Sequence, residues 1–274
     1  MNFIFFMNIT VDTIQCGDSS ELLKTLPSES VDFVLTSPPY DNLRSYNGYS
    51  FDFETIAMEL YRVLKVGGSM VWVVGDATIN GTETGTSFKQ ALYFKEIGFC
   101  LYDTMIYQKV NYVPLTHRRY EQAFEYMFVL TKGKPKTFNP ILIPCKNAGK
   151  LESYGTGRRS AIDAKQSMRS PDGISYKATK ETKIHPNIFP YTLGKSRTGH
   201  PAPFPCELAH DMLISWSNEG DVVLDPFMGS GTTALECVKL HRHFLGFEIS
   251  EEYVKMATDR VKAIQPPDYL SYDT

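Results

Sequence analysis

Residues 225–233 read Asp-Pro-Phe-Met-Gly-Ser-Gly-Thr-Thr, and a short apolar run, Val222 to Leu224, directly precedes them. The apolar run has the character of a buried strand, and the residues after it form a glycine-rich turn. Because glycine lacks a Cβ atom, the backbone of such a turn can approach a nucleotide-like ligand closely. The segment therefore predicts an α/β fold with a cofactor site at the end of this strand.

A second motif lies early in the chain. Residues 36–40 read Thr-Ser-Pro-Pro-Tyr and follow another strand-like run, Val31 to Leu35. The two prolines restrict the backbone, so that a hydroxyl, a carbonyl and an aromatic ring face one point. Together with the glycine-rich turn, this motif indicates that a cofactor and a flat, amine-bearing substrate meet at one edge of a sheet.

The composition is that of a globular protein. With 274 residues, 42% of them hydrophobic and 22% charged, the chain can form one large domain or one domain with an insertion. Its start lacks the cationic segment of a signal peptide, and no run reaches the roughly 18 apolar residues of a membrane span. The cysteines are odd in number and lack paired spacing, which indicates a reduced, cytoplasmic compartment and no structural zinc; they are Cys16, Cys100, Cys145, Cys206 and Cys237.

Positive charge is concentrated in one segment. Residues 131–200 hold 14 Lys plus Arg against 4 Asp plus Glu, and the remainder holds 14 against 27, for a net charge of −3. Such segregation indicates a basic face on an acidic body. A solvated Lys-rich loop would have a similar composition, but this segment also interleaves aromatic residues with its cations. The residues that we expect to contact nucleic-acid phosphates are Arg158, Arg159, Lys195 and Arg197.

Strand-like and helix-like segments alternate along most of the chain. Strands are predicted at 9–16, 31–35, 70–74, 102–108, 123–130, 222–224 and 244–247, and helices at 19–26, 53–64, 87–97, 206–217, 232–240 and 251–264. Gly67-Gly68 is interpreted as the signal that ends the second helix. The alternation predicts a doubly wound, mostly parallel sheet. Residues 131–199 lack periodicity and are predicted to be an insertion between two halves of one domain, 1–130 and 200–274.

The two motifs resemble those of a known family. Residues 225–233 are similar to the cofactor motif of the amino-group DNA methyltransferases, and residues 37–40 are similar to their catalytic tetrapeptide. The motif order, with the catalytic one first and the cofactor motif last, resembles the circularly permuted beta group. The resemblance covers most of the chain outside 131–199. It implies a Rossmann-like methyltransferase fold with a seven-stranded sheet, S-adenosylmethionine as methyl donor, and 131–199 as the target-recognition region for double-stranded DNA.

The tetrapeptide also implies which base is methylated. In the beta group it begins with Ser mostly in cytosine-N4 enzymes and with Asp or Asn mostly in adenine-N6 enzymes, and this chain has Ser37. Residues 118–133 resemble a strand-and-loop motif of the cytosine-N4 set. The resemblance therefore implies a bacterial or phage-type, site-specific cytosine-N4 DNA methyltransferase that acts in the cytoplasm, on the nucleoid.

Roles in cofactor binding follow from the resemblance and from the chemistry of S-adenosylmethionine. Glu248 ends the strand after the glycine-rich turn, where a carboxylate can accept both ribose hydroxyls. Asp18 resembles the family's adenine-side contact, Phe227 can pack on the cofactor, and His200 can close over its tail. No Lys follows the turn, which argues against a nucleoside-triphosphate loop, and no metal is expected. Any one of these acids alone would be read as a surface or capping residue; the remaining predicted cofactor residues are Asp225, Pro226, Gly229, Ser230, Gly231 and Thr232.

The tetrapeptide is expected to hold a base that is flipped out of the duplex. Tyr40 offers a stacking face worth about 1–3 kcal/mol per base. The Ser37 hydroxyl and the Pro38 carbonyl can accept hydrogen bonds from the exocyclic amine, and Pro39 completes the rigid turn. By itself, such a tetrapeptide is also compatible with a purely structural turn. Asp76, at the end of another strand, is either a pocket residue or a helix cap and is not included in the predicted site.

Several alternatives stay open. Adenine-N6 methylation is the closest; a non-catalytic nucleic-acid-binding module and an enzyme acting on a protein amide are others, against which the intact motifs and the basic segment argue. C5 methylation would need a nucleophile from a Pro-Cys pair, and the pairs at Cys145 and Cys206 are interpreted as structural because neither ends a core strand. The target sequence, a cognate restriction endonuclease partner and the formation of a homodimer cannot be read from the sequence.

Overall fold

The computed structural model describes residues 9–39, 52–112, 119–146, 148, 151–154, 168–169, 175–178, 180–192 and 205–264. The chain divides into two compact units. The first unit comprises Met1–Asn139 and Asn187–Thr274, and the second unit is Pro140–Pro186. No helix in the described part of the chain is long and apolar enough to cross a membrane.

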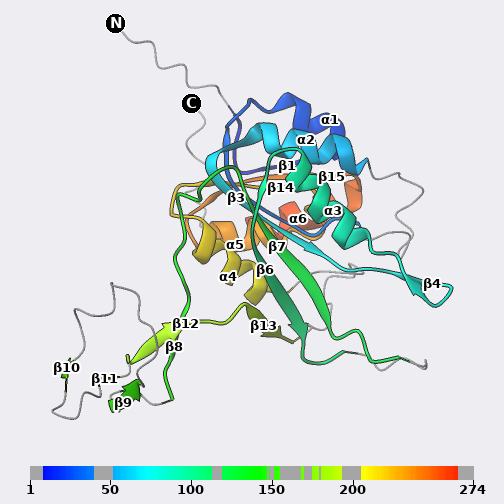
Figure 1. Cartoon of the computed structure of the whole chain (residues 1–274). Helices are drawn as coiled ribbons and strands as arrows, with labels where there is room; N and C mark the ends of the chain where they lie inside the picture. Colours follow the sequence, from blue (N-terminus) through cyan, green and yellow to red (C-terminus); the bar gives the residue numbers. More distant parts are fainter. Residues whose placement is uncertain are drawn as a thin grey trace, which may run out of the picture. The chain divides into compact units, whose positions relative to one another are not determined.

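The first unit is built around one eight-stranded sheet (Figure 1). Neighbouring strands are parallel except at β7, which runs antiparallel to β3 and β6. The predicted fold class, a doubly wound and mostly parallel α/β sheet, is confirmed. The strand order is β1 (Thr13–Cys16), β15 (His243–Glu248), β14 (Val222–Asp225), β2 (Val31–Thr36), β3 (Leu64–Val74), β7 (Phe124–Thr131), β6 (Cys100–Lys109) and β13 (Ile188–Tyr191).

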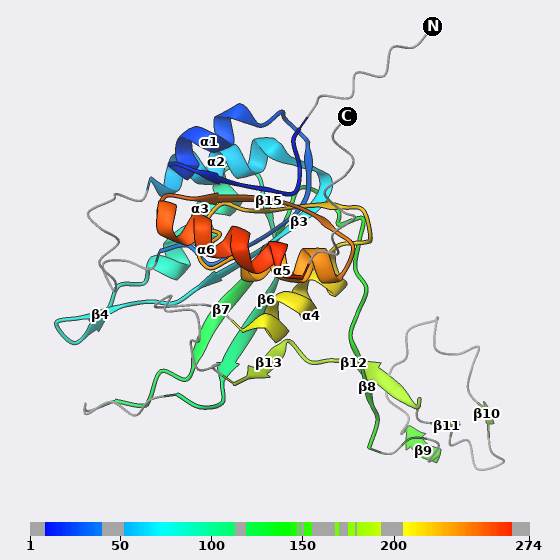
Figure 2. The ribbon, with the colours of Figure 1, turned by 180° about the vertical axis from the view of Figure 1, so that it is seen from behind.

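Helices cover both faces of this sheet (Figure 2). In α2, Asp52 caps the first turn by accepting the Thr55 N–H at 3.2 Å, and the buried residues recur at helical spacing, as in Ile56, Leu60 and Val63. A hairpin of two short strands, β4 (Thr78–Ile79) and β5 (Thr82–Glu83), joins β3 to α3. On one face lie α1 (Ser19–Thr25), α2 (Phe53–Val63) and α3 (Thr86–Glu96), and on the other lie α4 (Cys206–Trp216), α5 (Thr232–Lys239) and α6 (Glu251–Lys262).

Trp72 of β3 lies in the core on the α1–α3 face. Its side chain is fully buried, and its indole N–H donates to Gln90 Oε1 at 2.8 Å, so the polar atom of the ring is satisfied. The ring packs edge-on against Phe94, with centroids 5.1 Å apart, and lies 6.4 Å from the ring of Phe227 in the glycine-rich turn. The hydrophobic core therefore extends to the predicted cofactor motif.

The connections between strands place a switch point between β14 and β2. From β14 the chain passes through α5 to β15, and from β2 it passes through α2 to β3, on the opposite side. Because crossovers between parallel strands are right-handed, connections that diverge in this way put their helices on opposite faces of the sheet. Ligands of open α/β sheets bind at the carboxyl ends of the strands where this reversal occurs.

Two elements differ from the sequence prediction. β3 begins at Leu64, directly after α2, and runs through Gly67 and Gly68 instead of starting after them. A Cβ on Gly68 would lie 2.8 Å from Asp32 O, so this glycine permits close pairing with β2, whereas Gly67 has φ +84° and a Cβ there would lie 2.5 Å from Lys136 Cγ. Neither glycine terminates the helix, which ends at Val63. In addition, Ile188–Tyr191 pairs with β6, which gives the sheet eight strands where the sequence predicts seven.

The second unit lies within the segment 131–199 that the sequence analysis sets apart, whereas Thr131 and β13 belong to the first unit. It contains one two-stranded and one three-stranded antiparallel sheet. Its role in target recognition stays a prediction. The strands are β8 (Leu142–Pro144) with β12 (Thr182–Ile184), and β10 (Met168–Arg169), β11 (Ser175–Ala178) and β9 (Leu151–Tyr154).

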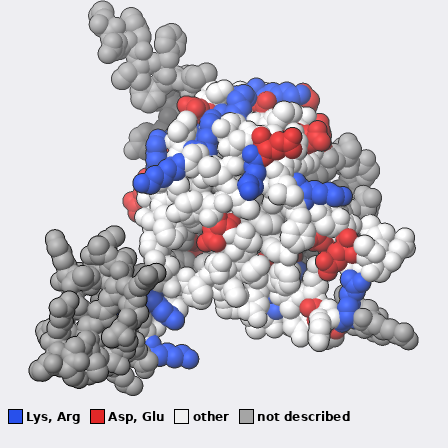
Figure 3. All heavy atoms as spheres, viewed as in Figure 1, with Lys and Arg blue, Asp and Glu red and all other residues white. Residues whose placement is uncertain are grey.

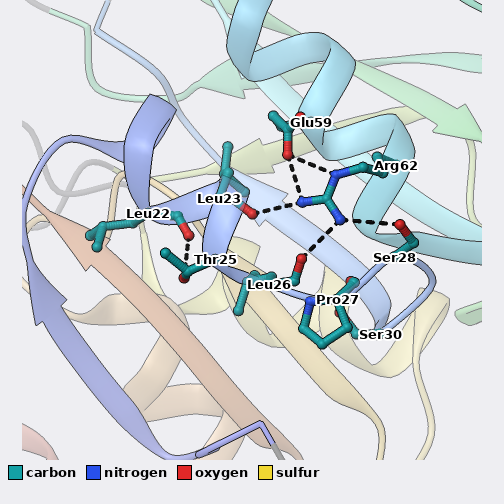
Figure 4. Close-up of polar contacts among 9 residues, drawn as sticks. All are labelled: Leu22, Leu23, Thr25, Leu26, Pro27, Ser28, Ser30, Glu59 and Arg62. Atoms are coloured by element: carbon teal, nitrogen blue, oxygen red, sulfur yellow. Dashed lines mark hydrogen bonds and ion pairs between the residues drawn. The ribbon is translucent and has the colours of Figure 1, made fainter. Parts of the chain in front are cut away.

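Arg62 of α2 ties the end of α1 to α2 (Figure 4). Its guanidinium donates to the carbonyl oxygens of Leu23 and Leu26 at 2.9 and 2.8 Å, and to Glu59 Oε2 at 2.6 and 2.8 Å. A cation that binds the last carbonyl groups of a helix also interacts favourably with the helix dipole. Arg62 therefore fixes α1, whose first residues lie at the carboxyl edge of the sheet.

Arg62→Ala should lower the free energy of unfolding by about 2–3 kcal/mol, because charge-assisted hydrogen bonds to two part-buried carbonyl groups are lost. Urea denaturation followed by circular dichroism measures this change. Lys24→Ala is the matched control, since it removes an exposed ion pair with Glu21 on α1, and it should leave the free energy of unfolding nearly unchanged because solvent screens such a pair. Equal effects of the two substitutions would contradict the structural role of Arg62.

Candidate active site

Both sequence motifs begin at the same edge of the sheet. β14 ends at Asp225 and its neighbour β2 ends at Thr36, so the two motifs leave adjacent strands. β15 ends at Glu248 and β1 ends at Cys16 on the same side, because these strands are parallel. We call residues 225–232 the glycine-rich loop and residues 37–39 the Ser-Pro-Pro segment.

The carboxylate of Asp225 lies beneath the glycine-rich loop and is 1% exposed. Its Oδ1 accepts the Thr36 hydroxyl at 2.7 Å and the Phe227 N–H at 3.0 Å, and its Oδ2 accepts the Thr233 hydroxyl at 2.6 Å. Burial raises the pKa of this carboxyl to about 6, although the three hydrogen bonds favour the charged form. Both oxygens of Asp225 are therefore engaged within the protein.

Glu248 holds the glycine-rich loop from the neighbouring strand. Its Oε2 accepts the Gly229 N–H at 2.9 Å, and its Oε1 accepts the Ser250 N–H at 3.0 Å. The side chain is half-buried. Because each carboxylate oxygen has more than one lone pair, these bonds leave capacity for ligand hydroxyl groups. The residue predicted to bind ribose also fixes the loop backbone.

Helix α6 packs directly on the glycine-rich loop. Arg260 donates through Nη1 to the Ser230 carbonyl oxygen, and to the Ser230 hydroxyl at 3.1 Å. Gly231 has φ +83°, and a Cβ there would come within 2.7 Å of Ala257 Cβ. A glycine is required at this position, because any side chain would push α6 away from the loop.

Three further predicted cofactor residues, Asp18, Phe227 and Thr232, lie along the same edge. Asp18 is exposed and caps α1, since its Oδ1 accepts the Ser20 N–H at 2.7 Å and the Ser20 hydroxyl at 2.6 Å. Phe227 is half-buried, and Thr232 is buried as the first residue of α5. His200 lies outside the described residues.

Three of the four predicted catalytic residues are described. Pro38 is buried, and Ser37 and Pro39 are half-buried, at positions that directly follow β2. The structure therefore brings this segment next to the glycine-rich loop. The other predicted site residues lie outside the described residues; they are Tyr40, Arg158, Arg159, Lys195 and Arg197.

Sequence analysis missed four residues that hold the glycine-rich loop. Thr36 and Thr233 donate to Asp225, Arg260 donates to the loop backbone, and Ser19 donates its hydroxyl to Pro226 O. Thr36 is the first residue of one quoted motif and Thr233 is the last residue of the other, which was the available signal. Nothing in the sequence distinguishes Ser19 or Arg260 from ordinary helix residues.

Two residues outside the predicted site lie in structural positions: Asp76, which the sequence left in question, and Cys206, which was interpreted as structural. Asp76 is buried, and its Oδ1 accepts the N–H of Ser87 in the first turn of α3 at 2.9 Å, so this carboxylate satisfies a free donor at the start of the helix. Cys206 begins α4, and burial raises the pKa of its thiol, which disfavours the thiolate that a nucleophile needs. Among the described residues, no group of three or more His, Cys, Asp or Glu could hold a metal ion.

The edge of the sheet is chemically suited to S-adenosylmethionine. The partly exposed carboxylate of Glu248 can accept ribose hydroxyls, and the half-buried ring of Phe227 can pack on the cofactor. The backbone of the glycine-rich loop lies close to the Glu248 carboxylate, which accepts the Gly229 N–H. A glycine-rich loop between a parallel strand and a helix, with an acid at the end of the next strand, defines a Rossmann-like protein that binds a nucleotide-type cofactor.

The chain belongs to the N6_N4_Mtase family of DNA methylases, which its sequence matches over residues 31–259. It is 50% identical to the orphan methyltransferase M.BamHII of Bacillus amyloliquefaciens over 240 residues. The matched region covers 85% of this chain and 89% of that protein. The family assignment makes the protein a DNA methyltransferase, and it includes enzymes of both N4 and N6 type.

Solved structures of similar proteins agree with this assignment. TTHA0409 of Thermus thermophilus, solved with S-adenosyl-L-methionine, is 25% identical with a TM-score of 0.62, over 92% of this chain and 93% of that one. The PvuII DNA methyltransferase (cytosine-N4-specific) is 23% identical with a TM-score of 0.65, over 90% and 85%, which supports the fold alone. S-adenosylmethionine is accordingly the cofactor of this protein.

Asp225→Asn should remove a pH-dependent part of the stability. A carboxyl whose pKa is about 6 when folded and about 3.9 when unfolded binds its proton more tightly in the folded chain. Its contribution to the free energy of unfolding is therefore fully present below pH 4 and is lost as the pH rises through 6. The stability of the wild type relative to Asp225→Asn should fall by about 2 kcal/mol between pH 4 and pH 7, measured by urea denaturation.

Asp259→Asn is the matched control on α6. The pKa of the exposed Asp259 is lowered by its hydrogen bond and ion pair with Lys255. Its contribution is therefore lost as the pH falls, and the wild-type advantage over this variant should show a weak trend of opposite sign. If the Asp225 difference increased with pH, hydrogen bonding would outweigh burial at this carboxyl.

Proposed function

We propose that the protein transfers a methyl group from S-adenosylmethionine to the exocyclic N4 amine of cytosine in double-stranded DNA, as a beta-group enzyme with permuted motif order. One observation carries the proposal. Ser37 begins the Ser-Pro-Pro segment one residue after Thr36, whose hydroxyl is bonded to Asp225 of the glycine-rich loop at 2.7 Å. The segment for the target amine and the loop for the cofactor thus start side by side.

Some residues of this edge are proposed to bind the cofactor and others to bind the target base. Bound S-adenosylmethionine supplies an electrophilic methyl group. Glu248 and Phe227 would hold the cofactor. A cytosine flipped out of the duplex would stack on Tyr40. The Ser37 hydroxyl and the Pro38 carbonyl would accept hydrogen bonds from its amine, and these acceptors favour the tetrahedral nitrogen of the transition state. In direct transfer the amine nitrogen would bond to the methyl carbon as the sulfonium–methyl bond breaks, S-adenosylhomocysteine would leave, and the nitrogen would lose one proton to solvent. Transfer of this kind needs no cysteine nucleophile.

The second unit is proposed as the target-recognition region. Residues 140–186 carry 9 Lys plus Arg against 4 Asp plus Glu. Figure 3 shows Lys or Arg side chains on this unit, and the described lysines Lys146, Lys180 and Lys183 are all exposed. Exposed cations on a unit with a positive balance suit contact with DNA phosphates.

The name of a relative bears on whether the enzyme acts with a paired restriction endonuclease. M.BamHII, half identical to this chain, is named an orphan methyltransferase. This name supports an enzyme that modifies DNA without a paired restriction endonuclease.

DNA from cells that express the protein should contain N4-methylcytosine, detected by mass spectrometry after digestion. Ser37→Ala should lower the rate of methyl transfer by about 10–100-fold, or about 1.4–2.8 kcal/mol, because the hydroxyl acts mainly on the tetrahedral amine. Its affinity for S-adenosylmethionine should stay near that of the wild type. Cys206→Ser is the control and should remain active.

The product distinguishes the alternatives. N6-methyladenine would identify an adenine-N6 enzyme and refute the choice of base. Recovery of 5-methylcytosine, together with loss of activity in Cys206→Ser, would overturn direct transfer to nitrogen. Absence of any modified base would leave a DNA-binding module.

DNA binding should weaken steeply with salt. The slope of log affinity against log salt should become shallower by about 0.9 for each phosphate that the protein no longer neutralises. The variant with four alanines at Arg158, Arg159, Lys195 and Arg197 should therefore show a clearly shallower slope in fluorescence anisotropy.

A second quadruple variant controls for net charge. It replaces four exposed lysines on helices of the first unit and should leave the slope near that of the wild type, because these residues are not assigned to the DNA interface. Equal slopes for the two quadruple variants would refute the assignment. The control lysines are Lys24, Lys95, Lys255 and Lys262.

A further inference from the structure

The side chain of Asp225 joins parts of the site where backbone pairing has stopped. The ladder between β2 and β14 comprises two residue pairs and ends at Val34 with Leu224. Beyond this point, toward the carboxyl edge, the hydrogen bond from Thr36 to Asp225 joins the two strand ends. The separation of the two strand ends at the site therefore depends on side chains.

Thr36 links the Ser-Pro-Pro segment to the glycine-rich loop. Its side chain is 0% exposed, its backbone pairs with Trp72 of β3, and the next residue is Ser37. The same carboxylate that accepts the Thr36 hydroxyl also accepts Thr233 in the first turn of α5. One buried group thus fixes the end of β2 and the start of α5 relative to each other.

We propose that Thr36 is a positioning residue for methyl transfer: through Asp225, its hydroxyl sets the distance between the Ser-Pro-Pro segment and the glycine-rich loop. The proposal rests on the proposed function, in which that segment holds the target amine. Direct transfer requires the reacting atoms to be aligned at about 3 Å, and a displacement of about 1 Å can cost about 100-fold in rate. Thr36 is 0% exposed and acts through Asp225.

A buried carboxylate that needs several hydrogen bonds is not required for stability at the position of Asp225. Replacing both members of a buried polar pair by apolar groups of the same shape is often nearly neutral for stability. A fully satisfied polar network, in contrast, admits a single arrangement of its members. Thr36, Asp225 and Thr233 form such a network at the switch point of the sheet, where alignment affects the rate of reaction.

The test compares Thr36→Val with Thr131→Val. Thr131 is also 0% exposed, and its hydroxyl donates to Gly133 O at 2.7 Å, at the opposite edge of the same sheet. Thr36→Val should lower the single-turnover rate of methyl transfer to DNA by about 10–100-fold and change the Kd for S-adenosylmethionine by less than about threefold. Thr131→Val should leave both within about twofold, although it loses an equivalent buried hydroxyl.

Two conservative variants separate positioning from folding. Thr36→Ser keeps the donor and should return the rate to within about threefold of the wild type, and Thr36→Cys, a weaker donor, should lie between Ser and Val. If Thr36→Val does not fold, the Ser and Cys variants carry the comparison. Rates that do not follow donor strength, or a loss of thermal stability with an unchanged rate, would overturn the proposal.

The product assay keeps this test separate from the proposed function. The rate counts methyl groups transferred to DNA, whichever base receives them. Finding N6-methyladenine would refute the cytosine assignment and leave the comparison of Thr36 variants valid. Finding N4-methylcytosine with equal rates for Thr36→Val and the wild type would refute the positioning role alone.

Discussion

A negative charge held out of water between two strand ends is the constraint on which the site depends. A buried carboxylate is costly unless donors surround it, and the donors to Asp225 come from the end of β2, from the loop itself and from the first turn of α5. The charge is accommodated only when all three segments are in place. The glycine-rich loop and the Ser-Pro-Pro segment therefore form one cooperative unit.

The same loop is restrained from its outer sides as well. Glu248 binds it from β15, Arg260 from α6 and Ser19 from α1, and Phe227 joins it to the aromatic core around Trp72. A loop fixed in this way is already shaped before a ligand arrives, so less ordering is required on binding. The extensive packing of α1 and α6 around the site is explained by this requirement.

Periodicity predicted the order and type of nearly all elements of the sheet, because the spacing of residues such as Ile56 and Leu60 reports burial against one face. It failed at Gly67-Gly68, since glycines that often end a helix can also lie within a strand, where Gly68 permits the close approach of Asp32 in β2. β13 was missed because it is four residues long and contains Pro190, which is tolerated only because this strand is at the edge of the sheet. Thr36 was missed because its partner is 189 positions away.

The chain leaves the first unit after Asn139 and re-enters it at Asn187. The Asn139 N–H donates to Ser215 O at 2.8 Å, while Asn187 accepts the Ile106 N–H at 2.8 Å and donates its amide to Thr104 O at 3.1 Å. Both points are fastened to the sheet or to α4 without help from the residues between them. The intervening stretch can therefore change in length and sequence without rebuilding the sheet, so evolution can vary the proposed recognition region while the fold of the first unit stays the same.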